Sequence, residues 1–167
     1  MALFNYIQHD IQIAPPLQSN AITSVTYSPY KLLMAGFNLQ VLISSIIPTK
    51  SKRVPKTATM IGHFDTGAST TSIDFKLAEL LELIPDGLTT INTANGVTKT
   101  PHYHVYISFP NTNLGPFDGI QVCSCNLGFD PNQNSNAYNV GLVIGRDIMS
   151  RWNIVWNGPT SCVFIAD

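Results

Sequence analysis

The stretch that most constrains this chain is residues 62–73, where an apolar run ends in an acid followed by small polar residues. The acid is Asp65, and Thr66 and Gly67 come directly after it. A glycine allows close approach of other backbone, or dihedral angles closed to other residues. The threonine hydroxyl can hydrogen-bond to backbone and fix the loop. The stretch therefore predicts a carboxylate presented on a tight loop at the end of a buried strand.

A second pattern lies far downstream, at residues 142–149, where an apolar run meets Gly-Arg, a polar residue and two further apolar residues. Taken with the Asp-Thr-Gly-Ala-Ser run, this pattern resembles the two signatures of retroviral-type aspartic proteases (retropepsins), over about residues 35–167. In that family the second motif threads a strand beside the catalytic loop and passes into a short helix. The resemblance implies that Asp65 is catalytic. It also implies that other residues support the loop (Thr66, Gly67, Ala68, Ser69) or serve the second motif structurally (Ile144, Gly145, Arg146).

The arginine of the second motif departs from the family in its expected partner. In retropepsins this arginine pairs with an acid just after the catalytic triplet, whereas residues 68–70 of this chain contain no acid. Arg146 therefore has three alternative partners: Asp147, backbone carbonyls or another subunit. Asp147 itself is a poor second catalytic acid, because a residue that enters a helix is badly placed to face Asp65.

One catalytic motif per chain predicts a symmetric dimer. The 167 residues contain a single Asp-Thr-Gly and no Asp-Ser-Gly, whereas two-lobed pepsin-like enzymes carry one aspartate in each lobe of a longer chain. A two-fold axis through the site would bring Asp65 against its own copy. We expect an aspartic endopeptidase that acts on peptide or protein substrates as a homodimer. Two alternatives stay open: an inactive or monomeric peptide-binding module of the same fold, and an unrelated β-barrel interaction protein.

The patterns along the chain predict a mainly β, single-domain closed barrel. The resemblance to retropepsins implies that this barrel is of the acid-protease type. Alternating apolar and polar residues predict a strand at 37–43. The next strand is expected at 57–64, where an apolar stretch leads into Asp65. A helix is expected at 73–83, after the catalytic loop, and a short one at 146–150 near the C-terminus. Residues 31–167 would form the protease domain, and residues 1–30 an N-terminal arm or added edge strand. A terminal hairpin at 152–166 departs from the single terminal strand of the viral enzymes.

A hairpin is also predicted over residues 88–109, because Asn-Gly between two strands is a strong turn signal. By position it resembles the flap that closes over substrate in retropepsins, with an ordinary surface hairpin as the alternative. The resemblance implies that the tip binds substrate through Thr93, Ala94, Asn95 and Gly96.

Charge and the remaining titratable residues narrow the classes of partner. Charged residues make up 11% of the chain and the net charge is −1, so we expect no nucleic-acid partner and no membrane surface as partner. The resemblance to retropepsins implies that no cofactor is needed. The N-terminus lacks the features of a signal peptide, which predicts a cytoplasmic location. The three cysteines predict buried or half-buried free thiols and no metal site. His63 either perturbs the ionisation of Asp65 or simply bonds a neighbour, and His102 and His104 are expected in surface or hairpin positions.

Overall fold

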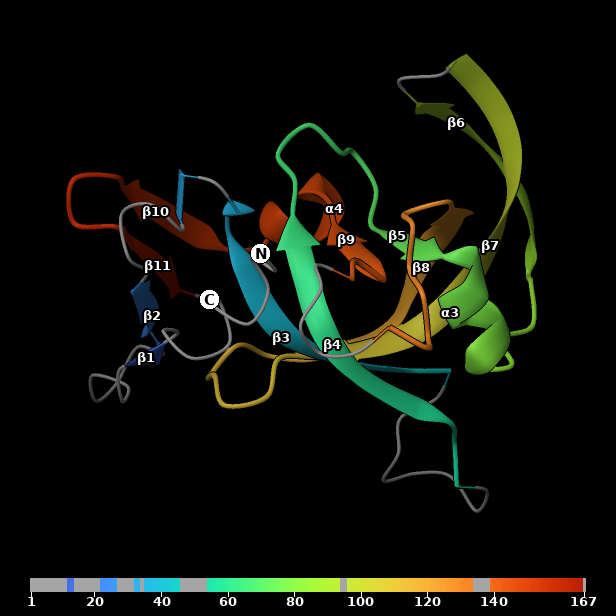
Figure 1. Ribbon diagram of the computed structural model, residues 1–167, viewed down its shortest axis with the longest axis horizontal. Coiled ribbons are helices and arrows are strands. Elements are labelled where there is room, and N and C mark those ends of the chain that lie inside the picture. Colours follow the sequence, from blue (N-terminus) through green and yellow to red (C-terminus); the bar gives the residue numbers. More distant parts are fainter. Residues whose placement is uncertain are drawn as a thin grey trace.

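The computed structural model describes residues 12–13, 22–26, 32–33, 35–45, 54–93, 96–133 and 139–166 (Figure 1). The described part is mainly β, with two short helices, α3 (Phe75–Leu80) and α4 (Arg146–Met149). The strands, in chain order, are β1 (Gln12–Ile13), β2 (Ile22–Thr26), β3 (Asn38–Ser44), β4 (Thr57–Phe64), β5 (Ser72–Asp74), β6 (Gly87–Thr93), β7 (Gly96–Ser108), β8 (Phe117–Cys125), β9 (Leu142–Ile144), β10 (Asn153–Asn157) and β11 (Cys162–Ala166).

Six of these strands close into a barrel, as the sequence predicted. The larger sheet has the order β3-β4-β9-β5-β8-β7-β6, and a further antiparallel pairing of β3 with β7 closes the ring. Most neighbours are antiparallel, but β4 pairs with β9, and β5 with β8, in parallel. The seventh strand, β6, extends the sheet beyond the ring as an arm of the β6–β7 hairpin, which projects at the upper right of Figure 1.

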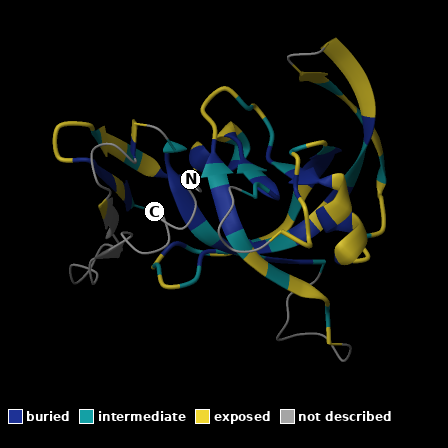
Figure 2. Cartoon of the chain, in the orientation of Figure 1, coloured by how far each residue is buried: buried dark blue, intermediate teal, exposed yellow. Residues whose placement is uncertain are grey.

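The core fills the barrel from strands whose residues alternate in burial. On β3, Leu39, Val41 and Ile43 are buried, while Gln40 and Leu42 between them are partly exposed. Figure 2 shows this gradient, with buried residues concentrated in the barrel strands and exposed residues on the outer hairpin and on much of α3. Burying such apolar side chains is the main stabilising contribution to a fold of this kind.

The helix predicted at 73–83 is shorter in the structure, where α3 covers only Phe75–Leu80. Ser72, Ile73 and Asp74 form β5, which lies between β8 and β9. Ile73 is fully buried there. Its backbone pairs with strands on both sides, so it belongs to the sheet and not to the helix. Asp74 then caps α3 by accepting a hydrogen bond from the Lys76 amide (2.8 Å).

A second, four-stranded sheet has the order β1-β2-β11-β10. The terminal hairpin forms as predicted, with residues 153–157 paired to 162–166. β2 pairs with the other edge of β11, so a strand from within residues 1–30 is added to this hairpin. Among the described residues, no helix combines the length and apolar composition that a membrane crossing requires.

Candidate active site

Asp65 stands at the end of β4, the strand between β3 and β9. The Asp65 amide donates to the carbonyl of Ile144 on β9 (3.1 Å), so the sheet pairing continues up to the acid itself. The preceding Phe64 is buried in the core, whereas the side chain of Asp65 is exposed. The strand is thereby fixed by its neighbours, and its last residue presents a carboxylate to solvent.

The loop after Asp65 turns back on the carboxylate. The Gly67 amide donates to Asp65 Oδ1 (2.7 Å), and the Ala68 amide donates to the Asp65 carbonyl (3.1 Å). A Cβ at Gly67 would lie 3.0 Å from Asp65 Oδ1, closer than most real Cβ contacts. Glycine at this position therefore allows the amide to reach the carboxylate and orient it. Thr66, Gly67 and Ser69 are exposed, and Ala68 is partly exposed.

Arg146 of the second motif stabilises this loop through two hydrogen bonds to its backbone carbonyls. The Arg146 amide donates to the Ala68 carbonyl (2.9 Å), and Arg146 Nη1 donates to the Thr66 carbonyl (2.6 Å). Of the alternatives left open for Arg146, the structure therefore shows a backbone carbonyl of the loop after Asp65. A Cβ at Gly145 would lie 2.5 Å from the carbonyl carbon of Thr70, so only glycine lets the start of α4 approach the loop this closely.

A hydrogen-bond network between Thr71 and Asp147 was missed at the sequence level. Asp147 Oδ2 accepts from the Thr71 amide (2.9 Å), and Oδ1 accepts from Thr71 Oγ1 (2.7 Å). The Gly145 amide in turn donates to Thr71 Oγ1 (3.0 Å), and the Ile148 amide donates to Asp147 Oδ1 (2.9 Å). Both carboxylate oxygens of Asp147 are therefore engaged, and they join α4 to Thr71, the residue before β5. The available signal was an acid in the first turn of a predicted helix, where amide donors are unpaired.

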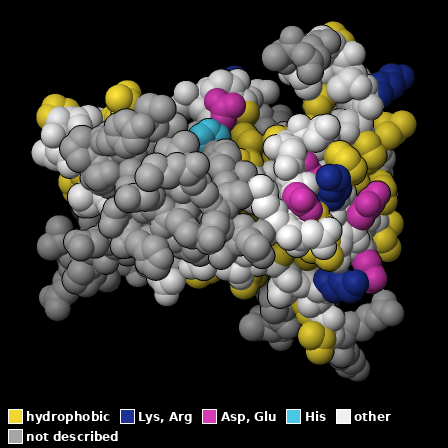
Figure 3. Space-filling model, viewed as in Figure 1, with side chains coloured by type: hydrophobic (Ala, Val, Ile, Leu, Met, Phe, Trp, Pro, Cys, Tyr) yellow, Lys and Arg dark blue, Asp and Glu magenta, His cyan; other side chains and the backbone are white. Residues whose placement is uncertain are grey.

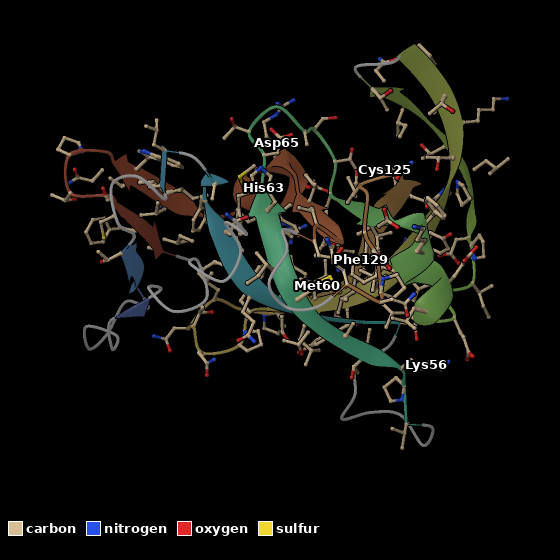
Figure 4. All side chains as sticks on the ribbon, in the orientation of Figure 1. Lys56, Met60, His63, Asp65, Cys125 and Phe129 are labelled. Carbon is tan, nitrogen blue, oxygen red and sulfur yellow. The ribbon has the colours of Figure 1, made fainter. Side chains whose placement is uncertain are left out.

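His63 lies two residues before Asp65 on β4, and its side chain is half-buried. Its Nδ1 lies 3.0 Å from Asn38 Oδ1 on β3. Burial lowers the pKa of His63 from its usual 6.5, while the charge of Asp65 acts in the opposite direction. The structure therefore gives His63 a bond to a neighbour and an electrostatic interaction with Asp65. Figure 4 shows the two labelled residues together at the upper end of β4.

The predicted hairpin is present, with Thr93 paired to Gly96 across its tip. Thr93 Oγ1 donates to the Gly96 carbonyl (3.1 Å), and Gly96 has a φ of 109°, which favours glycine. Ala94 and Asn95 lie outside the described residues. A groove of about 630 Å³ runs between this hairpin, α3 and the end of β8, lined among others by Phe75, Thr93 and Lys99. No residue of the Asp65 loop lines this groove.

His104 Nδ1 lies 2.7 Å from Asp86 Oδ2 at the surface, and this hydrogen bond lowers the pKa of Asp86. The three cysteines are free: Cys123 and Cys162 are buried and Cys125 is half-buried, as predicted. Within the described ranges, no three His, Cys, Asp or Glu side chains gather as a metal site. On the face seen in Figure 3, described charged side chains of both signs are interspersed.

Comparisons with known proteins add little to this picture. No family model matches the chain, and no curated protein matches it. Among solved structures, the chain is similar to the crystal structure of a retropepsin-like aspartic protease from Rickettsia conorii. The two are 11% identical with a TM-score of 0.47, over 91% of this chain and 97% of the other. At this level of similarity, function has to be inferred from the site itself.

Proposed function

We propose that this chain is an aspartic endopeptidase that works as a homodimer, with Asp65 of each copy forming the catalytic pair. The observation that carries the proposal is the exposed Asp65 carboxylate, held by the Gly67 amide at 2.7 Å on a loop braced by Arg146. A carboxylate held this way is pre-positioned for chemistry rather than free to rotate. By contrast, both carboxylate oxygens of Asp147 accept hydrogen bonds from the amide and hydroxyl of Thr71, as is typical of a structural acid.

Hydrolysis of a peptide bond requires a water made nucleophilic and a carbonyl polarised at the same time. Two carboxylates about 3 Å apart cannot both ionise, so they share one proton and their apparent pKa values separate. The ionised member removes a proton from water, and the protonated member donates to the carbonyl oxygen of the substrate. Those apparent pKa values belong to the pair and not to either residue.

The second carboxylate is the reason for proposing a dimer. The chain contains one Asp-Thr-Gly, and Asp147, the acid of the second motif, has both oxygens engaged by Thr71 and the Ile148 amide. A two-fold axis beside Asp65 supplies an identical carboxylate from another copy. In such a dimer Thr66, exposed at the loop, would face the partner.

The β6–β7 hairpin is the proposed cover of the substrate. It projects from the barrel at the upper right of Figure 1. Strand edges bind extended peptides through backbone hydrogen bonds, and a mobile cover excludes water from the reaction. We assign substrate binding to its tip, at Thr93, Ala94, Asn95 and Gly96.

A second candidate function is a monomeric or inactive peptide-binding module with the same barrel. One observation favours it: β11 is paired on one edge with β10 and on the other with β2. The terminal strand therefore has no open edge along residues 162–166 with which to join a partner's strand. A catalytic dimer would have to form through other surfaces, around the Asp65 loop itself.

The test is cleavage of a mixed peptide library across acid and neutral pH, by the natural chain and by Asp65→Asn. Asparagine keeps the size of the side chain but cannot share a proton as a carboxylate does. We expect cleavage that a pepstatin-type inhibitor blocks and that Asp65→Asn abolishes, with a particle mass of two chains. Lack of cleavage by a folded natural chain, with the mass of one chain, would overturn the proposal in favour of the binding module.

A further inference from the structure

The strand β10 forms one edge of the four-stranded terminal sheet. The order of this sheet is β1-β2-β11-β10, and among the strands that the structure describes β10 pairs with β11 alone. An open strand edge is a template for pairing with another chain, and proteins usually protect it with lysines, prolines or bulges. Residues 153–157 contain no charged residue and no proline, and their register with β11 runs without a bulge. The edge of β10 therefore carries none of these protections.

Apolar side chains at this edge are exposed rather than packed in the core. Val155 is 58% exposed, and Phe164, its register partner on β11, is 38% exposed. Trp156 is 53% exposed, although its register partner Val163 is fully buried. Figure 2 shows exposed residues along β10 at the upper left. Residues 153–166 carry no charged side chain, and the combination of aromatic residues with an absence of charge is typical of the core of a protein interface.

The order of side chains along β10 is symmetric about its middle residue. The strand reads Asn153, Ile154, Val155, Trp156 and Asn157, with a polar residue at each end and three apolar residues between them. An antiparallel partner runs in the reverse direction, so a second copy of β10 would place polar residues opposite polar ones and apolar residues opposite apolar ones. This pattern makes β10 complementary to itself.

We propose that β10 binds β10 of a second copy of this chain, edge to edge and antiparallel, with Val155 at the two-fold axis. The two terminal sheets then join into one continuous sheet. Because Val155 and Phe164 are register partners, the four side chains from the two copies form one apolar row across its outward face. Each copy uses the same edge, so the contact is closed and association stops at two chains.

The consequence of this pairing for catalysis rests on the proposed function, whereas the pairing itself does not. The last strand, β11, cannot serve as the contact edge, because β10 and β2 occupy both of its sides. Residues 150–152 alone separate β10 from α4, and Arg146 of α4 binds the Thr66 carbonyl in the loop after Asp65. Figure 1 shows α4 and β10 in its upper half. The edge that binds the second copy is thus connected through α4 to the loop that presents the acid.

The first test is the dissociation constant of the dimer, measured by sedimentation equilibrium for the natural chain and for Val155→Lys. The two lysines would face each other at the axis, and like charges directly opposite destabilise a strand pair. We expect the dissociation constant to rise at least about tenfold. Ile84→Lys is the matched control, because Ile84 is 83% exposed and lies between α3 and β6, on the other side of Figure 1 from β10.

We expect Ile84→Lys to dimerise as the natural chain does. The inference is overturned if Val155→Lys dimerises as tightly as the natural chain, if both variants are weakened equally, or if the natural chain has the mass of one chain at every concentration. Urea unfolding of each variant shows whether it is folded.

The register is tested by a disulfide at the axis. Residues directly opposite on antiparallel strands have Cα atoms about 4.5–5.5 Å apart, within the range of about 4.4–6.8 Å that a disulfide spans. We expect mild oxidation to link two chains of Val155→Cys, as seen on a non-reducing gel. Ile84→Cys and the natural chain, whose own cysteines are buried or half-buried, should stay unlinked. A Val155→Cys chain that does not link, or links no faster than Ile84→Cys, contradicts the inference, and this test decides the matter if Val155→Lys does not fold.

The outcomes also separate this inference from the proposed function. A natural chain that cleaves no peptide but dimerises through β10 would overturn the protease proposal and leave the edge pairing standing. Cleavage that depends on Asp65, together with a Val155→Lys dimer as tight as the natural one, would do the reverse. If both proposals hold, Val155→Lys loses cleavage at the dilutions where its chains separate.

Discussion

Replacing Thr71 tests whether hydrogen bonds or apolar packing stabilise the contact between the loop after Asp65 and the second motif, which contains Gly145 and Asp147. Thr71 is fully buried, and its Oγ1 donates to Asp147 and accepts from the Gly145 amide. Valine has nearly the same shape without the hydroxyl, whereas serine keeps the hydroxyl and loses a methyl group. The two substitutions therefore separate polar from apolar contributions at one position.

The two substitutions are expected to lower the free energy of unfolding by different amounts. Thr71→Val removes a hydrogen bond to a charged group, which contributes about 1.5–3 kcal/mol, and leaves the buried Gly145 amide without its acceptor. Because these effects overlap, we expect a loss of about 2–4 kcal/mol in the free energy of unfolding. Thr71→Ser loses one buried methyl group, which costs about 1 kcal/mol.

The assay is urea unfolding of both variants and the natural chain at one fixed protein concentration, because association would stabilise the folded state. We expect the order natural, Thr71→Ser, Thr71→Val from most to least stable, with similar slopes. If Thr71→Val were as stable as the natural chain and Thr71→Ser were the weaker variant, packing would dominate and the hydrogen-bond network would not be what holds the loop.

Three further predictions follow from single contacts. Gly145→Ala places a Cβ 2.5 Å from the Thr70 carbonyl carbon, so we expect a loss of about 1–3 kcal/mol in urea unfolding and a displaced α4; an unchanged unfolding midpoint would refute the close approach. Asp74→Ala removes the acceptor of the Lys76, Leu127 and Phe129 amides, so it should cost about 3 kcal/mol, whereas Asp74→Asn, which keeps one oxygen, should cost less. Burial lowers the pKa of His63 below 6.5, so the unfolded chain binds its proton first as pH falls. Stability should therefore decrease from about pH 6.5 down to the folded pKa and then level off, and His63→Asn should lose this dependence in unfolding measured against pH.

Local patterns were sufficient for much of the barrel. β4 occupies residues 57–64 as predicted, because the apolar stretch and the acid at its end are both local features. The β6–β7 hairpin also followed from local chemistry, since Asn-Gly predicted a reversal within residues 88–109 and Thr93 pairs with Gly96 there. These elements form where the sequence alone already favours them, and the rest of the fold agrees with that preference.

Contacts between distant residues were harder to predict. Thr71 and Asp147 are 76 residues apart, and a threonine and an aspartate of this kind occur in many loops without meeting. β5 has three residues, too few for a periodic pattern, and it precedes residues with a helical apolar spacing. Its strand conformation comes from pairing with β8 and β9 on either side, which no local signal reveals. The pairing of β2 with β11 likewise joins residues far apart in the sequence, so no local pattern predicts it.

Subunit mixing directly tests the proposal that each chain supplies one Asp65 to a catalytic pair. A fixed amount of natural chain is allowed to re-equilibrate with increasing Asp65→Asn chain, and peptide cleavage is followed. We expect cleavage to fall toward zero as mixed dimers with a single Asp65 replace natural dimers. We also expect Asp65→Asn alone to be inactive. Cleavage that stays constant at a large excess of Asp65→Asn would mean that one chain is sufficient, and would contradict the claim.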